Sequence, residues 1–167
     1  MKFINTFRIA ALVALFSLAA HAQMRGVGLG AYLQAGNAGE VGGLNAKMFL
    51  DARTALDLSL SIENDPFGAS MGAYASYLIH HWDVIPVARG KMPLYIGPNG
   101  GVGIWNGGTA IRFGGIGGMA YCMDPGMAPL DFYLQLNPTM EYQIFDGTHN
   151  DKLVFDLYLQ LGMRFFL

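Results

Sequence analysis

The sequence of 167 residues has little charge, little lysine and a single cysteine. Ten Lys and Arg residues and a net charge of −2 leave no basic patch to displace counterions from phosphates, so we expect no nucleic-acid binding. The lone Cys122 cannot form an internal disulfide, which excludes a disulfide-stapled secreted domain, and we interpret it as a packed thiol. Hydrophobic residues make up 53% of the chain, which excludes intrinsic disorder.

The first 22 residues have the three parts of a secretory signal peptide. Lys2 and Arg8 form a positive start, residues 9–20 are apolar, and Ala20-His21-Ala22 is an A-x-A cleavage site. The apolar stretch is shorter than the roughly 20 residues that a membrane-spanning helix needs. We therefore predict residues 1–22 as a signal peptide and residues 23–167 as one exported domain, which would place the protein outside the cytoplasm.

After residue 23 the sequence also lacks an apolar run long enough for a transmembrane helix, and alternation with a period of two dominates instead. Four segments alternate clearly, and four others, rich in glycine and tyrosine, alternate more weakly. A helix would spread the apolar residues of the clear segments around its circumference, so we predict strands. The clear segments are 44–51, 55–64, 130–142 and 153–167, and the weaker ones are 25–34, 71–81, 93–105 and 110–122.

Eight strands joined by mostly short connections predict an antiparallel up-and-down β-barrel, because a crossover helix does not fit between them. Three features place the apolar face outside. The polar face has few lysines for a surface in water, eight strands pointing Leu and Phe inward would overpack a narrow barrel, and apolar faces of about ten residues match tilted transmembrane strands. The predicted fold is therefore an all-β, eight-stranded antiparallel transmembrane barrel, closed because only a closed sheet satisfies its backbone in lipid.

The inward-facing positions of these strands then collect charged residues of both signs. Because side chains fill the interior of an eight-stranded barrel, we expect these charges to be desolvated and paired. They are interpreted as a structural ion network that plugs the lumen, and a proton or ion path is the alternative. The predicted lumen ion network comprises Lys47, Asp57, Glu63, Arg112, Asp131, Glu141, Asp156 and Arg164.

The ending Gly162-Met163-Arg164-Phe165-Phe166-Leu167 resembles the C-terminal assembly signal of bacterial outer-membrane barrels, with Gly162, Phe165 and Leu167 at the signal positions. It departs from that signal in its last residue, Leu167, and in Leu161 before the glycine. The segments PLYIGPNGGVGIW, TAIRFGGIGGMAY and APLDFYLQLNPTMEY also resemble a little-studied family of small outer-membrane barrels of the OmpX and OmpA transmembrane type. This resemblance implies an outer-membrane location, with outer-membrane lipid and the barrel assembly machinery as partners of a monomer.

The function favoured by the sequence is structural or surface-interacting, without catalysis, cofactor or metal. A lipid-modifying outer-membrane enzyme is an alternative, because Ser76, His80 and His81 with a nearby acid could form a Ser-His-Asp arrangement. Otherwise His80 and His81, with Trp82, would line the membrane interface. A soluble periplasmic lipocalin-like binder is a third possibility.

Pro98 and Pro138 lie inside predicted strands, where they require either a bulge or a shorter strand.

Overall fold

The structure is a computed structural model that describes residues 26–36, 39–65, 68–123, 129–145 and 151–167, without the side chains of 40, 63–65, 68 and 69. The predicted signal peptide, residues 1–22, lies outside the described residues. Eight strands account for nearly all of the described chain, and none of the described residues forms a helix long and apolar enough to cross a membrane. The strands are β1 (Val27–Gly36), β2 (Gly39–Phe49), β3 (Thr54–Asp65), β4 (Gly68–Ile85), β5 (Met92–Trp105), β6 (Gly108–Cys122), β7 (Leu130–Phe145) and β8 (Lys152–Phe166).

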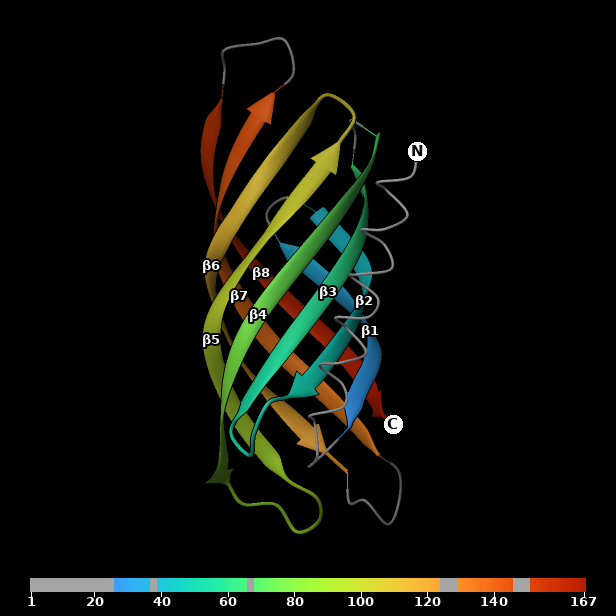
Figure 1. The fold of residues 1–167 in the computed structure, drawn as a ribbon, viewed down its shortest axis with the longest axis vertical. Helices are drawn as coiled ribbons and strands as arrows, with labels where there is room; N and C mark the ends of the chain where they lie inside the picture. The colour runs from blue at the N-terminus through green and yellow to red at the C-terminus, as the bar shows by residue number, and fades with distance from the viewer. Residues whose placement is uncertain (1–25, 37–38, 66–67, 124–128, 146–150) are drawn as a thin grey trace, which may run out of the picture.

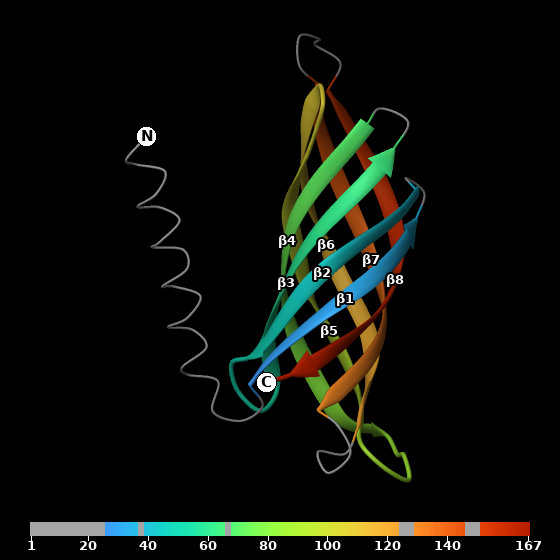
Figure 2. The ribbon, with the colours of Figure 1, turned by 90° about the vertical axis from the view of Figure 1, so that its right-hand side faces the viewer.

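Each strand pairs antiparallel with its neighbours in sequence, and β1 pairs with β8, so the sheet is a closed barrel (Figure 1). This confirms the predicted fold class. Strand β1 begins and strand β8 ends at the same end of the barrel, called the terminal end here (Figure 2). The turns at residues 50–53 and 86–91 also lie at the terminal end, and the β1–β2 hairpin lies at the opposite end (Figure 2).

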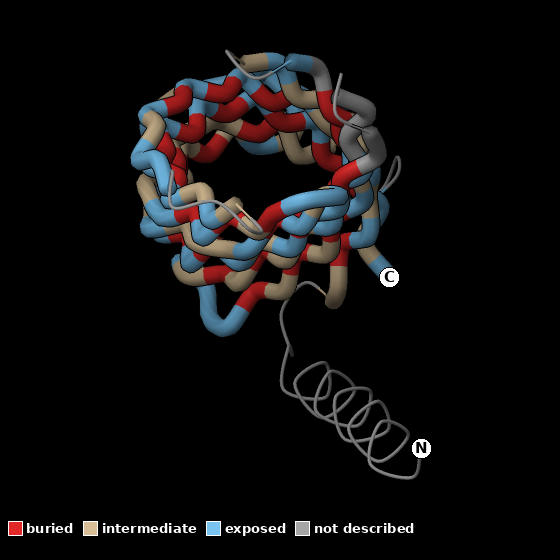
Figure 3. Tube along the Cα trace, turned by 90° about the horizontal axis from the view of Figure 1, so that it is seen from above, coloured by how far each residue is buried: buried red, intermediate tan, exposed pale blue. Residues whose placement is uncertain are grey.

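Burial alternates residue by residue along the strands, as the period of a pleated strand requires (Figure 3). In β7 the buried positions from Asp131 to Glu141 alternate with exposed positions from Phe132 to Tyr142. The buried set is rich in Asn, Gln, Asp, Arg and Tyr, whereas the exposed set consists largely of Leu, Ile, Met and Phe. The polar face therefore lies inside the barrel, which is the reverse of the arrangement that a soluble lipocalin-like binder needs.

The two prolines inside strands interrupt pairing on one side only. Strand β5 stays paired to β6 through Pro98, and β7 stays paired to β8 through Pro138. On the other side the ladder skips the two pairs at each proline and resumes in the same register. A proline lacks the N–H that one ladder bond needs, so a local loss of pairing is sufficient. Both alternatives that we predicted, a bulge at the proline or a shorter strand, are wrong.

The seam between β1 and β8 joins small residues to large ones on the inner face. Gly30 lies opposite Arg164, Gly36 lies opposite Tyr158, and Tyr32 lies opposite Gly162. A Cβ added at Gly36 would meet the Tyr158 ring at 2.3 Å, and one added at Gly30 would meet Cγ of Arg164 at 2.5 Å. In this register the β8 side chains therefore occupy the space that a larger residue at either β1 position would need.

Strand β4 is longer than its alternation predicted, 18 residues instead of the eleven from 71 to 81. Its pairing with β5 shifts register between His81 and Ile85, so the strand continues past an irregularity toward the terminal end. Strand β2 also begins earlier than predicted, at Gly39, because its glycines hide the alternation without preventing pairing.

Candidate functional site: the polar lumen

The predicted lumen residues whose side chains are described all lie inside the barrel. Each has at most 9% of its surface exposed, although all are ionisable. They come from strands β2, β3, β6, β7 and β8, which the closed barrel brings around one interior. These residues are Lys47, Asp57, Arg112, Asp131, Glu141, Asp156 and Arg164; the side chain of Glu63 lies outside the described part of the structure.

Arg164 is the centre of the first cluster of charges and is completely buried. Its Nη1 donates to Asp57 Oδ2 at 2.5 Å, and its Nε donates to Asp131 Oδ1 at 3.0 Å. Its guanidinium carbon also lies 3.9 Å from the centroid of the Tyr133 ring, a cation–π contact. Asp131 is the cross-strand neighbour of Arg164, whereas Asp57 reaches it across the lumen from β3. One arginine therefore joins opposite walls of the barrel.

Lys47 adds a second cation to this region. It lies opposite Asp57 in the β2–β3 register, and its Nζ lies 5.0 Å from the centroids of both the Phe49 and Tyr95 rings. Two cations and two carboxylates give the cluster no formal net charge. Balance of this kind is required where charges are removed from water, because an uncompensated buried ion costs several kcal/mol.

Arg112 is the centre of a second cluster. Its Nε donates to Glu141, its cross-strand neighbour, and its Nη1 donates to the hydroxyl of Tyr74. Its guanidinium also lies 5.8 Å from the Tyr158 ring centroid, and the Tyr158 hydroxyl donates to Asp156 at 3.3 Å. The described contacts thus divide the predicted network into one cluster around Arg164 and another around Arg112.

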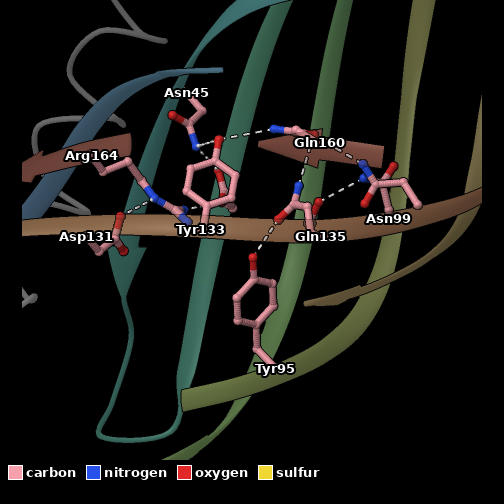
Figure 4. A network of polar contacts seen from close by, with 11 residues as sticks. Asn45, Tyr95, Asn99, Asp131, Tyr133, Gln135, Gln160 and Arg164 are labelled. Atoms are coloured by element: carbon pink, nitrogen blue, oxygen red, sulfur yellow. Dashed lines mark hydrogen bonds and ion pairs between the residues drawn. The ribbon is translucent and has the colours of Figure 1, made fainter. Parts of the chain in front are cut away.

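Amides and tyrosines extend the first cluster across the lumen (Figure 4). The Tyr133 hydroxyl accepts hydrogen bonds from Asn45 at 3.0 Å and from Gln160 at 3.1 Å. Gln135 donates to Gln160 at 2.9 Å and accepts from the hydroxyl of Tyr95 at 2.8 Å. The predicted ion network named only charged residues, although the inward parity of Tyr133 had also predicted that its side chain fills the lumen. The amide members Asn45, Gln135 and Gln160 have the same inward parity, which is the signal that could have added them to the network.

A cavity of about 30 Å³ remains among these polar side chains, lined by residues that include Gln34, Ser59, Asn99, Asn137 and Thr139. A cavity needs about 10–15 Å³ by this measure to hold a water molecule, so there is room for water. The Oδ1 atom of Asn137 is buried without a hydrogen-bond partner in the described structure, and a water molecule in the cavity would satisfy it. The cavity therefore suits bound water.

His80 lies inside the terminal end of the barrel. Its ring packs 5.0 Å from Phe49 and 5.6 Å from Trp82, and its Nδ1 lies 3.1 Å from the carbonyl oxygen of Arg53. His81 is exposed on the other face. Our alternative placing His80 and Trp82 on the outer interfacial surface is therefore wrong, because the parity of β4 turns both side chains inward.

The same strand also separates the residues of the predicted catalytic arrangement. Ser76 and His80 are four residues apart on β4, so their Cα atoms are about 13 Å apart at the usual rise of a strand. A nucleophile and its base need to be in hydrogen-bond contact. The Ser76 hydroxyl instead accepts a hydrogen bond from Asn99 at 2.9 Å. Within the described residues there is also no group of three or more His, Cys, Asp or Glu side chains placed to hold a metal ion.

The residues predicted as an assembly signal lie at the end of strand β8, with Leu167 directly after it. Phe165 and Leu167 point outward, with 47% and 76% of their surface exposed, whereas Gly162 faces inward against the Tyr133 ring. This end of β8 therefore presents apolar side chains to the surroundings of the barrel.

The turn between β2 and β3 is held by Asp51 at the terminal end. Its carboxylate accepts hydrogen bonds from the Thr54 hydroxyl at 2.6 Å and from the backbone N–H groups of Arg53 and Thr54, both at 2.7 Å. The Thr54 hydroxyl contributes most, followed by the two N–H groups, and together they hold the pKa of Asp51 below its usual value of 3.8.

A closed eight-stranded barrel with ion pairs inside and large apolar side chains outside is the architecture of small transmembrane β-barrels. Comparison with solved structures gives the same class. The chain is similar to Neisserial surface protein A, with a TM-score of 0.56 and 13% identity, over 84% of this chain and 96% of that one. It is also similar to the N-terminal β-barrel domain of Pseudomonas aeruginosa OprF, with a TM-score of 0.51 and 14% identity, over 83% and 95%.

Both of these proteins are small barrels of the bacterial outer membrane, and at such low identity the likeness establishes the fold alone. No family model matches the sequence, and no curated protein matches it.

Proposed function

We propose that the protein is an integral barrel of the bacterial outer membrane with a structural or surface-interaction role, no catalysis, and a lumen plugged by its own side chains. The observation that carries this proposal is the distribution of side chains across the barrel wall. Arg164, Lys47 and Asp131 are almost completely buried inside, while Leu33 and Phe155 outside have 72% and 61% of their surface exposed. A continuous apolar belt of this extent fits a bilayer and would aggregate in water.

The plugged lumen is supported by the contacts that cross it. Arg164 joins β8 to β3, the Tyr133 and Gln160 side chains join it to the amide network, and the cavity among these side chains has a volume of only about 30 Å³. An eight-stranded barrel has an interior only wide enough for side chains. We infer that the charges stabilise the barrel and do not conduct ions.

The partners follow from the same surfaces. Bilayer lipid would cover the apolar belt, and the barrel assembly machinery would engage the C-terminal strand during biogenesis after export by the signal peptide. Strand β1 pairs with both β2 and β8, so the sheet offers no open edge along that seam, and we infer a monomer. The terminal end would face the periplasm.

Fractionation of cells that express the full chain tests the proposal. The protein should stay with outer membranes after a carbonate wash, and unheated samples should migrate differently from boiled samples in SDS, because a closed barrel resists the detergent. Release into buffer together with identical migration would contradict a membrane barrel. A change in lipid A composition on expression, abolished by His80→Ala, would instead favour the enzyme.

A further inference from the structure

An apolar groove lies on the outer wall where β1, β2 and β8 meet. It has a volume of about 470 Å³, and its lining residues with outward parity are Leu33, Ala35, Gly42, Leu159 and Leu161. Gln34 and Val41 also border it, but they are cross-strand neighbours on the lumen-facing parity. None of the outward-facing lining residues is charged or polar. Such a volume lies within the range of roughly 300–1,000 Å³ that is typical of ligand pockets.

The groove exists because small residues interrupt a wall of leucines. Leu33 lies opposite Leu161 on β8 and opposite Gly42 on β2, and Ala35 lies opposite Leu159. The β1–β2 hairpin also ends well below the end of β7 and β8, so the taller β8 flanks the groove on one side (Figures 1 and 2). A Cβ added at Gly42 would meet only ordinary contacts, at 3.8 Å from Leu33 and 3.9 Å from the Tyr32 carbonyl oxygen.

We propose that this groove binds one acyl chain of a bilayer lipid more tightly than the rest of the outer wall does. The proposal rests on the proposed function, since bilayer lipid is then the medium around the groove. Its lining offers neither charge nor a hydrogen-bonding side chain directed outward, so the occupant must be apolar. The hydrogen-bond ladder is complete on both sides of β1 at this height, which excludes an added β-strand.

The size of the groove favours a lipid chain over a protein partner as its occupant. A stable interface with a second copy buries about 800 Å² on each partner through roughly 20–30 residues. The groove is formed by seven residues on three strands, which is too few for such an interface. A narrow flexible hydrocarbon chain can fill it and gain dispersion contacts that a flat leucine wall would not give.

Photocrosslinking in lipid nanodiscs tests the proposal with the full mature chain. The probe is a phosphatidylglycerol that carries a diazirine midway along one acyl chain, and crosslinked peptides are mapped by mass spectrometry. Gly42→Leu fills the groove, and Gly117→Leu is the matched control, because Gly117 also faces outward and has open space around it. Both variants should keep the SDS-resistant barrel, which shows that they fold.

We expect crosslinks to concentrate on peptides that contain Leu33 and Leu159, and to fall there about tenfold in Gly42→Leu, equivalent to about 1.4 kcal/mol. Gly117→Leu should leave them unchanged. Equal labelling of all outward strands, unaffected by either variant, would mean ordinary surrounding lipid and would overturn the proposal. A dimer that dissociates in Gly42→Leu would assign the groove to a second copy and also overturn it. A chain that does not insert into nanodiscs at all would instead contradict the proposed function.

Discussion

Replacing Arg164 by methionine removes a completely buried cation that joins β8 to β3 across the lumen. Asp57 and Asp131, which lie 2.5 and 3.0 Å from its nitrogens, would then face each other with Lys47 as the only remaining cation of the cluster. Breaking a buried ion pair from one side typically costs about 3–5 kcal/mol, because a desolvated charge is left without compensation. Arg164→Met should therefore lower the free energy of unfolding by about 3–5 kcal/mol, apart from the lost contact with Tyr133.

Urea unfolding in phospholipid vesicles, followed through the fluorescence of Trp82 and Trp105, measures this loss. The double variant Arg164→Met/Asp131→Asn restores the charge balance with Lys47 and Asp57, so it should recover more than half of the stability lost. Arg89→Met, in an exposed turn, is the control and should change stability by less than about 0.5 kcal/mol. A loss below about 1 kcal/mol in the single variant, typical of a solvated pair, would refute the reasoning, as would a double variant no more stable than the single one.

Purified protein in planar bilayers should show no steady ion conductance, and a reproducible open channel that Arg164→Ala alters would contradict the plugged lumen. Leu134→Arg, near the middle of the apolar belt, should lower the free energy of unfolding in vesicles by about 2–4 kcal/mol. Leu153→Arg, at the end of the barrel opposite the terminal end, should lower it by about 0–1 kcal/mol. Equal losses would mean that no bilayer surrounds the belt. At the terminal end, Thr54→Val should raise the pKa of Asp51 in an NMR titration of its carboxyl carbon. Because folding lowers the pKa of Asp51, the stability that this residue contributes is present above about pH 3.8 and is lost as the pH falls through the lower pKa of the folded protein. An unchanged pKa in Thr54→Val would contradict the hydrogen bond from the Thr54 hydroxyl.

The number of strands, and the side of each residue in the strands that alternate clearly, could be predicted because a strand places alternate residues on opposite faces. In β7 and β8 the sequence alternates without interruption, and the predicted inward positions of Asp131 and Arg164 are the observed ones. Where glycine and alanine replace large residues, as in β2 and β4, the alternation is too weak to fix where a strand begins or ends. That is also why the inward direction of His80 was missed.

The partners of the charged residues were harder to predict, because they depend on register and on closure of the barrel. The pairs Asp131–Arg164 and Arg112–Glu141 are cross-strand neighbours within hairpins, so the hairpin register alone would have identified them. The contact of Arg164 with Asp57 joins residues 107 positions apart across the lumen, and only the closed barrel brings them together. The prolines were hard to predict for a related reason. The sequence does not reveal that strand pairing is lost on one side of each proline and kept on the other.

The claim that polar side chains face the lumen while apolar side chains face lipid is tested most directly along β7. Spin labels placed one at a time at positions 131–142, in a Cys122→Ser background and in bilayers, report collisions with oxygen dissolved in the lipid. We expect high oxygen accessibility at the exposed even positions, such as Phe132, Leu134 and Leu136, and low accessibility at the buried odd positions between them. High values at the odd positions, or accessibility that does not alternate at all, would contradict the claim.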